Sequence, residues 1–293
     1  MISYNPKQWS RILFDITKKD TLVKMFPALV FVCVYTAIIA YIELEYLHLN
    51  DDHWLKATPQ MHGLLGFAIS MLLVFRTNTA YDRWWEGRRL WGILVNNSRN
   101  LCIKLKAFLP ALHTEDRAFF RKLIPQFAFE LIGHLQAERT RLALDENPHP
   151  EIPDFNTNEH VPGQIAALMY AKAGQLASQK VISGEQLIIL NHELQGFLEI
   201  CGACERIKNT PIPYSYSSFI KKFIFIYVLT LPFGFVFTLG YYAIAVVAFV
   251  FYVLGSLELI AEEIEDPFGK DENDLPMHKL ATTIQMNVNE LLP

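Results

Sequence analysis

The chain has 293 residues, of which 52% are hydrophobic and 19% charged, with 26 basic against 30 acidic residues and a mean hydropathy of +0.19. This hydropathy is high for a soluble domain and low for a bundle of membrane helices alone, so a mixture of membrane and aqueous parts is predicted. The apolar content excludes a disordered chain. The near-neutral charge argues against a nucleic-acid partner, which usually requires a basic face.

Three long apolar stretches predict the membrane-spanning helices. The first covers residues 25–42 and the second residues 57–75, and each is long enough to cross the core of a bilayer. The third, residues 223–257, contains no charged residue and is too long for one span. We therefore expect it to hold two helices that turn near residues 238–240, which gives four spans per subunit.

The charged residues that flank these stretches predict the orientation. Basic residues gather before the first span, after the second and before the third, whereas the loop after the first span is acidic. Because basic loops stay on the cytoplasmic side, both termini and the middle of the chain are predicted to be cytoplasmic, in a multi-pass protein of the cell inner membrane. The basic residues are Lys7, Arg11, Lys18, Lys19, Lys24, Arg76, Arg83, Arg88, Arg89, Lys208, Lys221 and Lys222, and the acidic ones are Glu43, Glu45, Asp51 and Asp52.

Five segments follow from this pattern. The middle of the chain mixes apolar and charged residues at helical spacing, without a convincing alternating strand, so an all-α protein is predicted. The segments are a cytoplasmic N-terminal segment (1–24), the first two spans (25–80), a cytoplasmic helical region (81–218), the last two spans (219–260) and an acidic cytoplasmic C-terminal segment (261–293).

Cys201 and Cys204 form a C-x-x-C pair, a spacing that can lower a thiol pKa or supply half of a zinc site. A full site needs two more ligands, and no second pair exists, so we interpret both cysteines as small buried residues of a helix. A membrane-bound redox or zinc enzyme that uses Cys201 and Cys204 remains the alternative of another class. The sequence shows no H-E-x-x-H, phosphate-loop or G-x-S-x-G motif, so no enzyme is expected and no cofactor is required.

The second apolar stretch carries Phe67, Met71 and Phe75 at positions i, i+4 and i+8, which places them on one helix face. Packing or lipid contact ordinarily explains such a row. Four spans this apolar are too few to enclose water within one subunit, so a pore would have to lie on a symmetry axis between subunits. Small residues that permit close approach of membrane helices accompany the row, namely Gly63, Gly66, Ala68 and Ser70.

Three blocks of the sequence resemble the bacterial members of the bestrophin family. They are GFAI, VFRTN and YDRWWE within 66–86, CERI and TPIPY within 204–214, and EEIEDPFG and NDLP within 262–276. The resemblance implies a homopentamer of all-helical subunits around a central pore, in contact with membrane lipid and permeating small ions. It also implies that Phe67, Met71 and Phe75 form a narrow neck, where an apolar ring gates by excluding water.

The resemblance further implies a second constriction at the cytoplasmic end of the pore, at or near Glu185. The family has a small apolar side chain there, whereas five carboxylates around a narrow opening would attract cations. Monovalent cation conduction is therefore predicted, with a chloride or other anion channel of the same architecture as the alternative. Glu185 is alternatively a solvated acid at the start of a helix.

In animal members of the family, an acidic run after the Pro-Phe-Gly block binds calcium. Asp271 and Asp274 match acidic positions of that run and offer the hard oxygen ligands that calcium prefers, so calcium is an expected optional ligand. Lys270 and Asn273 stand where the run has acids. The alternative is a solvated acidic segment, or one that forms salt bridges with the basic N-terminal tail of a neighbouring subunit.

Overall fold

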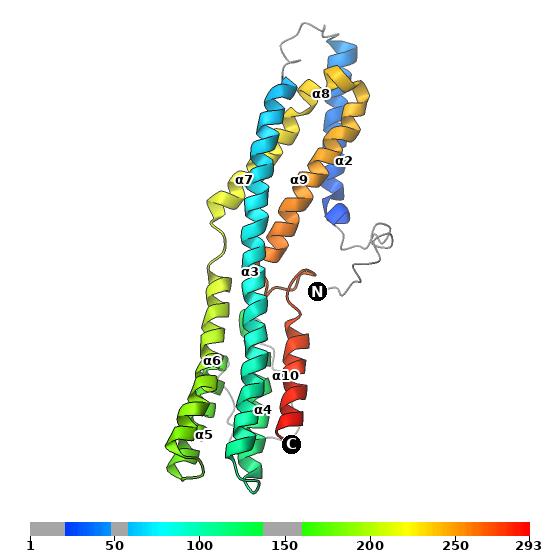
Figure 1. Cartoon of the computed structure of the whole chain (residues 1–293). Helices are drawn as coiled ribbons and strands as arrows, with labels where there is room; N and C mark the ends of the chain where they lie inside the picture. The colour runs from blue at the N-terminus through cyan, green and yellow to red at the C-terminus, as the bar shows by residue number, and fades with distance from the viewer. Residues whose placement is uncertain (1–20, 48–57, 137–159) are drawn as a thin grey trace. The chain divides into compact units, whose positions relative to one another are not determined.

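A computed structural model of the chain describes residues 21–47, 58–136 and 160–293, and every regular element in these residues is helical (Figure 1). The predicted all-α class is therefore confirmed. Most of the predicted N-terminal segment lies outside the described residues, as do Asp51 and Asp52 of the predicted acidic loop. The chain forms two compact units, each of which combines segments that are distant in the sequence.

The membrane unit comprises the described parts of residues 2–83 and of residues 212–265. Three of its helical stretches are long and apolar enough to cross a membrane, namely Thr21–Tyr46, the start of Thr58–Phe108, and Tyr214–Glu265. Its elements are α2 (Thr21–Tyr41), the π-helix η1 (Ile42–Tyr46), the first part of α3 (Thr58–Phe108), α7 (Tyr214–Thr230), α8 (Pro232–Leu239), the short 3-10 helix η3 (Gly240–Tyr242) and α9 (Ala243–Glu265).

The stretch Tyr214–Glu265 reverses direction at Gly240. This glycine has a φ of +55°, a left-handed conformation that side-chain-bearing residues rarely adopt. Helices α7 and α8 pack against α9 after the reversal, and α2 packs along α9. The stretch therefore supplies two spans, and the predicted turn near residues 238–240 is confirmed.

A cluster of aliphatic side chains from α2, α3, α7 and α9 forms the core of the membrane unit. Ile69 and Leu73 contribute to it from α3 and are almost fully buried. Gly66 permits close approach of α7, because a Cβ at this position would lie only 2.7 Å from the Tyr227 hydroxyl oxygen. The predicted role of small residues thus holds at Gly66, whereas Gly63 faces open space in the single chain.

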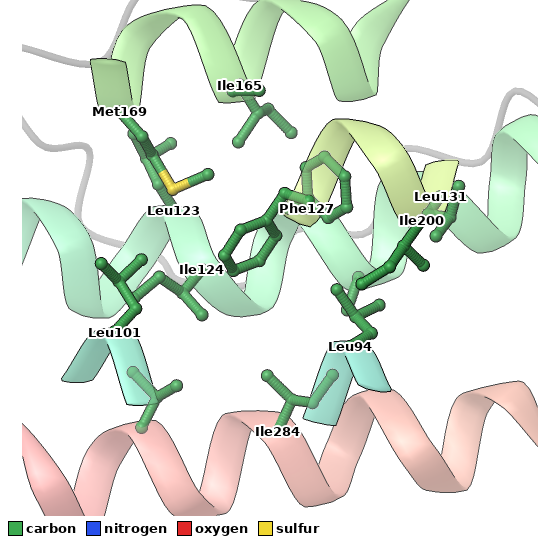
Figure 2. Packing of buried hydrophobic residues seen from close by; sticks show 14 of the residues in the cluster. Leu94, Leu101, Leu123, Ile124, Phe127, Leu131, Ile165, Met169, Ile200 and Ile284 are labelled. Carbon is green, nitrogen blue, oxygen red and sulfur yellow. The ribbon is translucent and has the colours of Figure 1, made fainter. Parts of the chain in front are cut away.

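The second unit, which we call the helical unit, comprises the described parts of residues 84–211 and 266–293. Its core brings together apolar side chains of all five helices (Figure 2). Phe127 of α4 meets Phe197 of α6 edge to face, with ring centroids 5.0 Å apart. The helices are the remainder of α3, α4 (Thr114–Leu135), α5 (Val161–Ser178), α6 (Gly184–Asn209) and α10 (Met277–Leu291).

Candidate functional site

The predicted neck residues lie on the exposed face of α3. Phe67, Met71 and Phe75 are 70%, 50% and 55% exposed in the single chain, whereas Ile69 and Leu73 point into the core of the membrane unit. This division follows from the helical period, because residues four apart share one face. The row is therefore available to something outside its own subunit.

Exposure alone does not separate a pore face from a lipid face. Leu64 and Val74 on α3 are as exposed as the row itself. Helix α2 also presents large apolar side chains outward, with Phe31, Val34 and Ile38 each more than half exposed. Such a surface is unstable in water, so every one of these faces requires lipid, another subunit or a dewetted space.

Arg76 follows the row and forms a buried ionic network with two acids of α9. Its side chain is only 1% exposed. Nη2 donates to Oε2 of Glu265 at 2.7 Å, and Nε lies 3.5 Å from Oε2 of Glu258. Glu265 also accepts the backbone N–H of Ile212 at 2.7 Å, and its main-chain oxygen accepts Nε of Arg83 at 3.0 Å. The network joins α3, the end of α9 and the segment that precedes α7.

The neighbouring acids at the end of α9 are also paired within the same chain. Lys221 donates to Glu262 at 2.8 Å, and Lys24 donates to Glu263 at 2.5 Å. Lys24 belongs to the predicted basic N-terminal segment. The salt bridge between that segment and the acids after the last span, expected with a neighbouring subunit, therefore forms here within one chain. These carboxylates have countercharges without a metal ion.

In the loop after α9, carboxylate side chains accept hydrogen bonds from backbone N–H groups of the same loop. Oδ2 of Asp274 accepts the N–H of Asp271 at 2.5 Å, and Oδ1 of Asp266 accepts the N–H of Phe268 at 3.3 Å. Gly269 is needed for this arrangement, because a Cβ there would lie 2.8 Å from Oδ2 of Asp274. The Asp271 side chain is exposed.

Asp274 is the candidate calcium ligand that the structure buries. It is 2% exposed, and Oδ1 has no hydrogen-bond partner among the residues that the structure describes. Burial raises the pKa of this carboxyl to about 7. Calcium takes six to eight oxygens, and one buried oxygen beside an exposed Asp271 does not by itself make such a site. Calcium binding at Asp271 and Asp274 therefore stays a prediction.

Side chains of the helical unit anchor the same loop. Nε1 of Trp84 donates to the Asn273 carbonyl at 2.8 Å, and Nε2 of Gln136 donates to the Gly269 carbonyl at 2.9 Å. Phe268 is buried against α3 at Gly87, where a Cβ would come within 3.2 Å of its ring. The Pro-Phe-Gly block thus has a structural role that does not depend on a metal ion.

Glu185 lies in the first turn of α6, whose N-cap is Ser183. The Ser183 hydroxyl oxygen accepts the N–H of Gln186, and the Gln186 side chain accepts the N–H of Ser183, which is a complete capping box. The Ser183 hydroxyl also donates to Glu185 at 2.6 Å, and this bond lowers the pKa of the Glu185 carboxyl. An exposed acid at a helix start is locally favourable. Its place at a pore opening stays a prediction.

Cys201 and Cys204 are buried on α6 and have the character of inert thiols. Their exposed fractions are 1% and 0%. Burial, with a smaller effect of Glu205, raises the pKa of Cys201 to about 12, and burial also raises the pKa of Cys204. Thiolates, which metal binding and redox exchange require, are therefore disfavoured. The interpretation as two small buried helix residues is confirmed.

These observations define an all-helical membrane protein with four spans and a second helical unit. Comparison with known proteins identifies its family: the model for bacterial and fungal bestrophin proteins matches residues 1–290. The chain belongs to the bestrophin family. The resemblance stated from the sequence and the expected absence of enzyme activity are both confirmed.

Similar proteins and structures agree with this assignment. A voltage-dependent anion channel-forming protein of Nostoc sp. is 34% identical over 80% of this chain and 79% of its own length. Another protein of that name, from Mesorhizobium japonicum, is 30% identical over 96% of this chain and 89% of its own. The crystal structure of a bacterial bestrophin homologue from Klebsiella pneumoniae is 28% identical and has a TM-score of 0.80, covering 92% of this chain and all of that one. These names give no support to the predicted cation conduction, and the anion alternative fits them better.

Proposed function

We propose that the protein is a passive anion channel, a homopentamer whose subunits surround one central pore. Family membership and the anion channel-forming relatives support this proposal. The observation that carries it is the exposed row of Phe67, Met71 and Phe75 on α3, opposite a face that is buried in its own subunit. We further propose that both termini are cytoplasmic and that the channel resides in the inner membrane.

In this proposal the row forms the neck of the pore. Each side chain is repeated around the symmetry axis, so three apolar rings stack one helical turn apart. A narrow apolar ring opposes ion passage, because an ion that loses its hydration finds no replacement ligand there. Since the rings are uncharged, the sign of the conducted ion depends on residues elsewhere.

Lipid contact is assigned to α2. Its exposed side chains Phe31, Val34 and Ile38 form an apolar face with no charged member, and lipid tails favour such a face. In this assignment the exposed apolar face of α2 contacts lipid, whereas the exposed apolar row of α3 borders the pore. It also provides a control for the neck.

Recording from the purified protein in a planar bilayer with asymmetric potassium chloride tests the proposal. For an anion channel, the reversal potential should shift toward the chloride equilibrium potential, which is roughly 59 mV for a tenfold gradient. Replacing Phe67, Met71 and Phe75 together with alanine should raise the conductance. The matched control replaces Phe31, Val34 and Ile38 with alanine, and its conductance should stay unchanged.

Three results would contradict the proposal. A silent bilayer would exclude a channel, and a shift toward the potassium equilibrium potential would exclude anion selectivity. Equal conductance in the two triple variants would exclude the neck. Glu185→Gln tests the predicted inner opening in the same recordings: removal of a ring of carboxylates should increase anion preference, whereas an unchanged reversal potential would leave Glu185 as a first-turn acid only.

A further inference from the structure

A cluster of two histidines and one glutamate connects three helices of the helical unit. His134 comes from the last turn of α4, His160 is the N-cap residue of α5, and Glu205 lies on α6. Nε2 of His134 lies 2.6 Å from Oε1 of Glu205, and Nε2 of His160 lies 2.8 Å from the same oxygen. All three potential ligand atoms lie within 4.8 Å of one another. The proposed pore does not require this convergence.

Local interactions hold the cluster in place. Nδ1 of His160 accepts the N–H of Gly163 at 2.8 Å, which caps α5. Lys208 donates to the main-chain oxygen of His134 at 3.3 Å, which connects α6 to the end of α4. The two imidazole rings meet edge to face with centroids 4.6 Å apart. The three side chains are between 30% and 42% exposed, so an ion in solution can reach them.

The hydrogen bonds also determine where the protons of His160 and Glu205 reside. Because Nδ1 of His160 accepts a backbone N–H, the proton of this ring belongs on Nε2, which donates to Glu205. Partial burial would raise the pKa of Glu205, but the hydrogen bonds from His160 and His134 hold it below the usual value. Glu205 is therefore an ionised carboxylate with two imidazoles directed at one of its oxygens.

We propose that His134, His160 and Glu205 form a binding site for a divalent transition-metal ion of the zinc class. Two imidazole nitrogens and one carboxylate oxygen are ligands that zinc accepts, with water in the fourth position. Calcium is a poor match, because it prefers oxygen ligands only. The site lies outside the acidic loop with Asp271 and Asp274.

The distances show what binding would change. With zinc–ligand bonds of about 2.0–2.1 Å in tetrahedral geometry, neighbouring ligand atoms lie roughly 3.3 Å apart. The present separations of 2.6 and 2.8 Å are hydrogen-bond lengths. The ion would therefore replace the two bonds to Glu205 after these separations widen by roughly 0.5–0.7 Å. A half-exposed side chain at a helix end can make this shift.

Binding also requires the ring proton of His160 to move. When Nε2 of His160 ligates the ion, the ring proton resides on Nδ1, and His160 ceases to accept the N–H of Gly163. Sγ of Cys201 lies 3.8 Å from Nε2 of His160, but its thiol is buried and protonated. We therefore leave sulfur out of the ligand set, which distinguishes this site from a zinc site built on Cys201 and Cys204.

The test is zinc binding to the purified full-length protein in detergent, with any affinity tag removed. Isothermal titration and elemental analysis should give one zinc ion per chain. His134→Gln, His160→Asn and Glu205→Gln should each weaken binding by roughly 100-fold or more. Asparagine at 160 is chosen because it is itself a good N-cap residue, so α5 keeps its start. His278→Ala, which removes an exposed histidine outside the cluster, should bind zinc like the wild type.

Cobalt substitution tests the ligand set independently. Tetrahedral cobalt bound by nitrogen and oxygen should give visible absorption bands without a thiolate-to-metal charge-transfer band. A charge-transfer band that disappears in Cys201→Ser would overturn the ligand set. The site itself would be overturned if the wild type binds no metal, or if it and all three cluster variants bind the metal equally. None of these readouts depends on ion conduction, so a failed channel measurement leaves them interpretable.

Discussion

Replacing Arg76 with methionine tests whether the buried ionic network stabilises the membrane unit. The Arg76 side chain is 1% exposed, and those of Glu258 and Glu265 are 7% and 14% exposed. Methionine retains much of the side-chain volume and removes the charge, so the buried carboxylates of Glu258 and Glu265 lose the guanidinium beside them. Removing one partner of a buried pair typically lowers the free energy of unfolding by about 3–5 kcal/mol.

The pair of Lys221 and Glu262 is a matched control. Its N–O distance of 2.8 Å is close to the 2.7 Å between Arg76 and Glu265, but its side chains are 47% and 53% exposed. Exposed pairs contribute about 0–1 kcal/mol, so Lys221→Met should have a small effect. Unfolding by SDS in mixed micelles, followed by far-ultraviolet circular dichroism, measures the loss of stability in both variants, and the loss should be larger for the buried pair.

A second substitution tests the cause of the loss. In Arg76→Met with Glu265→Gln, one uncompensated charge is gone, and the glutamine amide oxygen still accepts the N–H of Ile212. The double variant should therefore recover part of the lost stability. Two results would show that compensation of buried charge does not explain the role of Arg76. In one, Arg76→Met lowers the free energy of unfolding no more than Lys221→Met does. In the other, the double variant is less stable than Arg76→Met alone.

Two further predictions concern the loop after α9. The raised pKa of Asp274, about 7 against roughly 3.9 in an unfolded chain, means that its contribution to stability is complete below about pH 4 and is lost as the pH rises through 7. The thermal stability of Asp274→Asn relative to the wild type should therefore increase between pH 5 and 8. Stability-versus-pH profiles that stay parallel for the two proteins would contradict this prediction. Phe268→Ala should lower the free energy of unfolding by about 3–5 kcal/mol, because it empties a buried aromatic site, and a loss under 1 kcal/mol would refute the anchoring role.

The spans were predictable from the sequence because the bilayer imposes a simple requirement. A helix that crosses it needs about twenty apolar residues, and the charges that bound each stretch mark its ends. The reversal was predictable as well, because a stretch too long for one span has to turn, and Gly240 tolerates the positive φ of the turn. Both inferences use only neighbouring residues.

The polar sites were not predictable because their members are far apart in the chain. Arg76 follows an apolar stretch directly, where a buried arginine and a solvent-facing one have the same local sequence. Only the fold shows that it meets Glu258 and Glu265. His134, His160 and Glu205 likewise occupy no recognisable spacing, whereas the recognisable pair Cys201 and Cys204 is buried as thiols. Spacing detects ligands that share one element, and it misses ligands that packing brings together.

For the proposed neck, helical periodicity determines which residues share a face but not what that face contacts. The spacing places Phe67 and Phe75 on one face, and the burial of Ile69 shows that this face turns away from its own chain. A face toward lipid requires only apolar character, whereas a ring around a pore also requires side chains of a certain size.

Phe67→Leu and Phe75→Leu retain the apolar character and reduce the volume, so they should raise single-channel conductance if the row borders the pore. Phe31→Leu on α2 makes the same chemical change on the proposed lipid face and should leave conductance as it was. Because the three substitutions alter hydrophobicity equally, a common effect on all three would reflect general packing of the membrane unit. Only an effect confined to α3 agrees with a neck whose width controls the passage of ions.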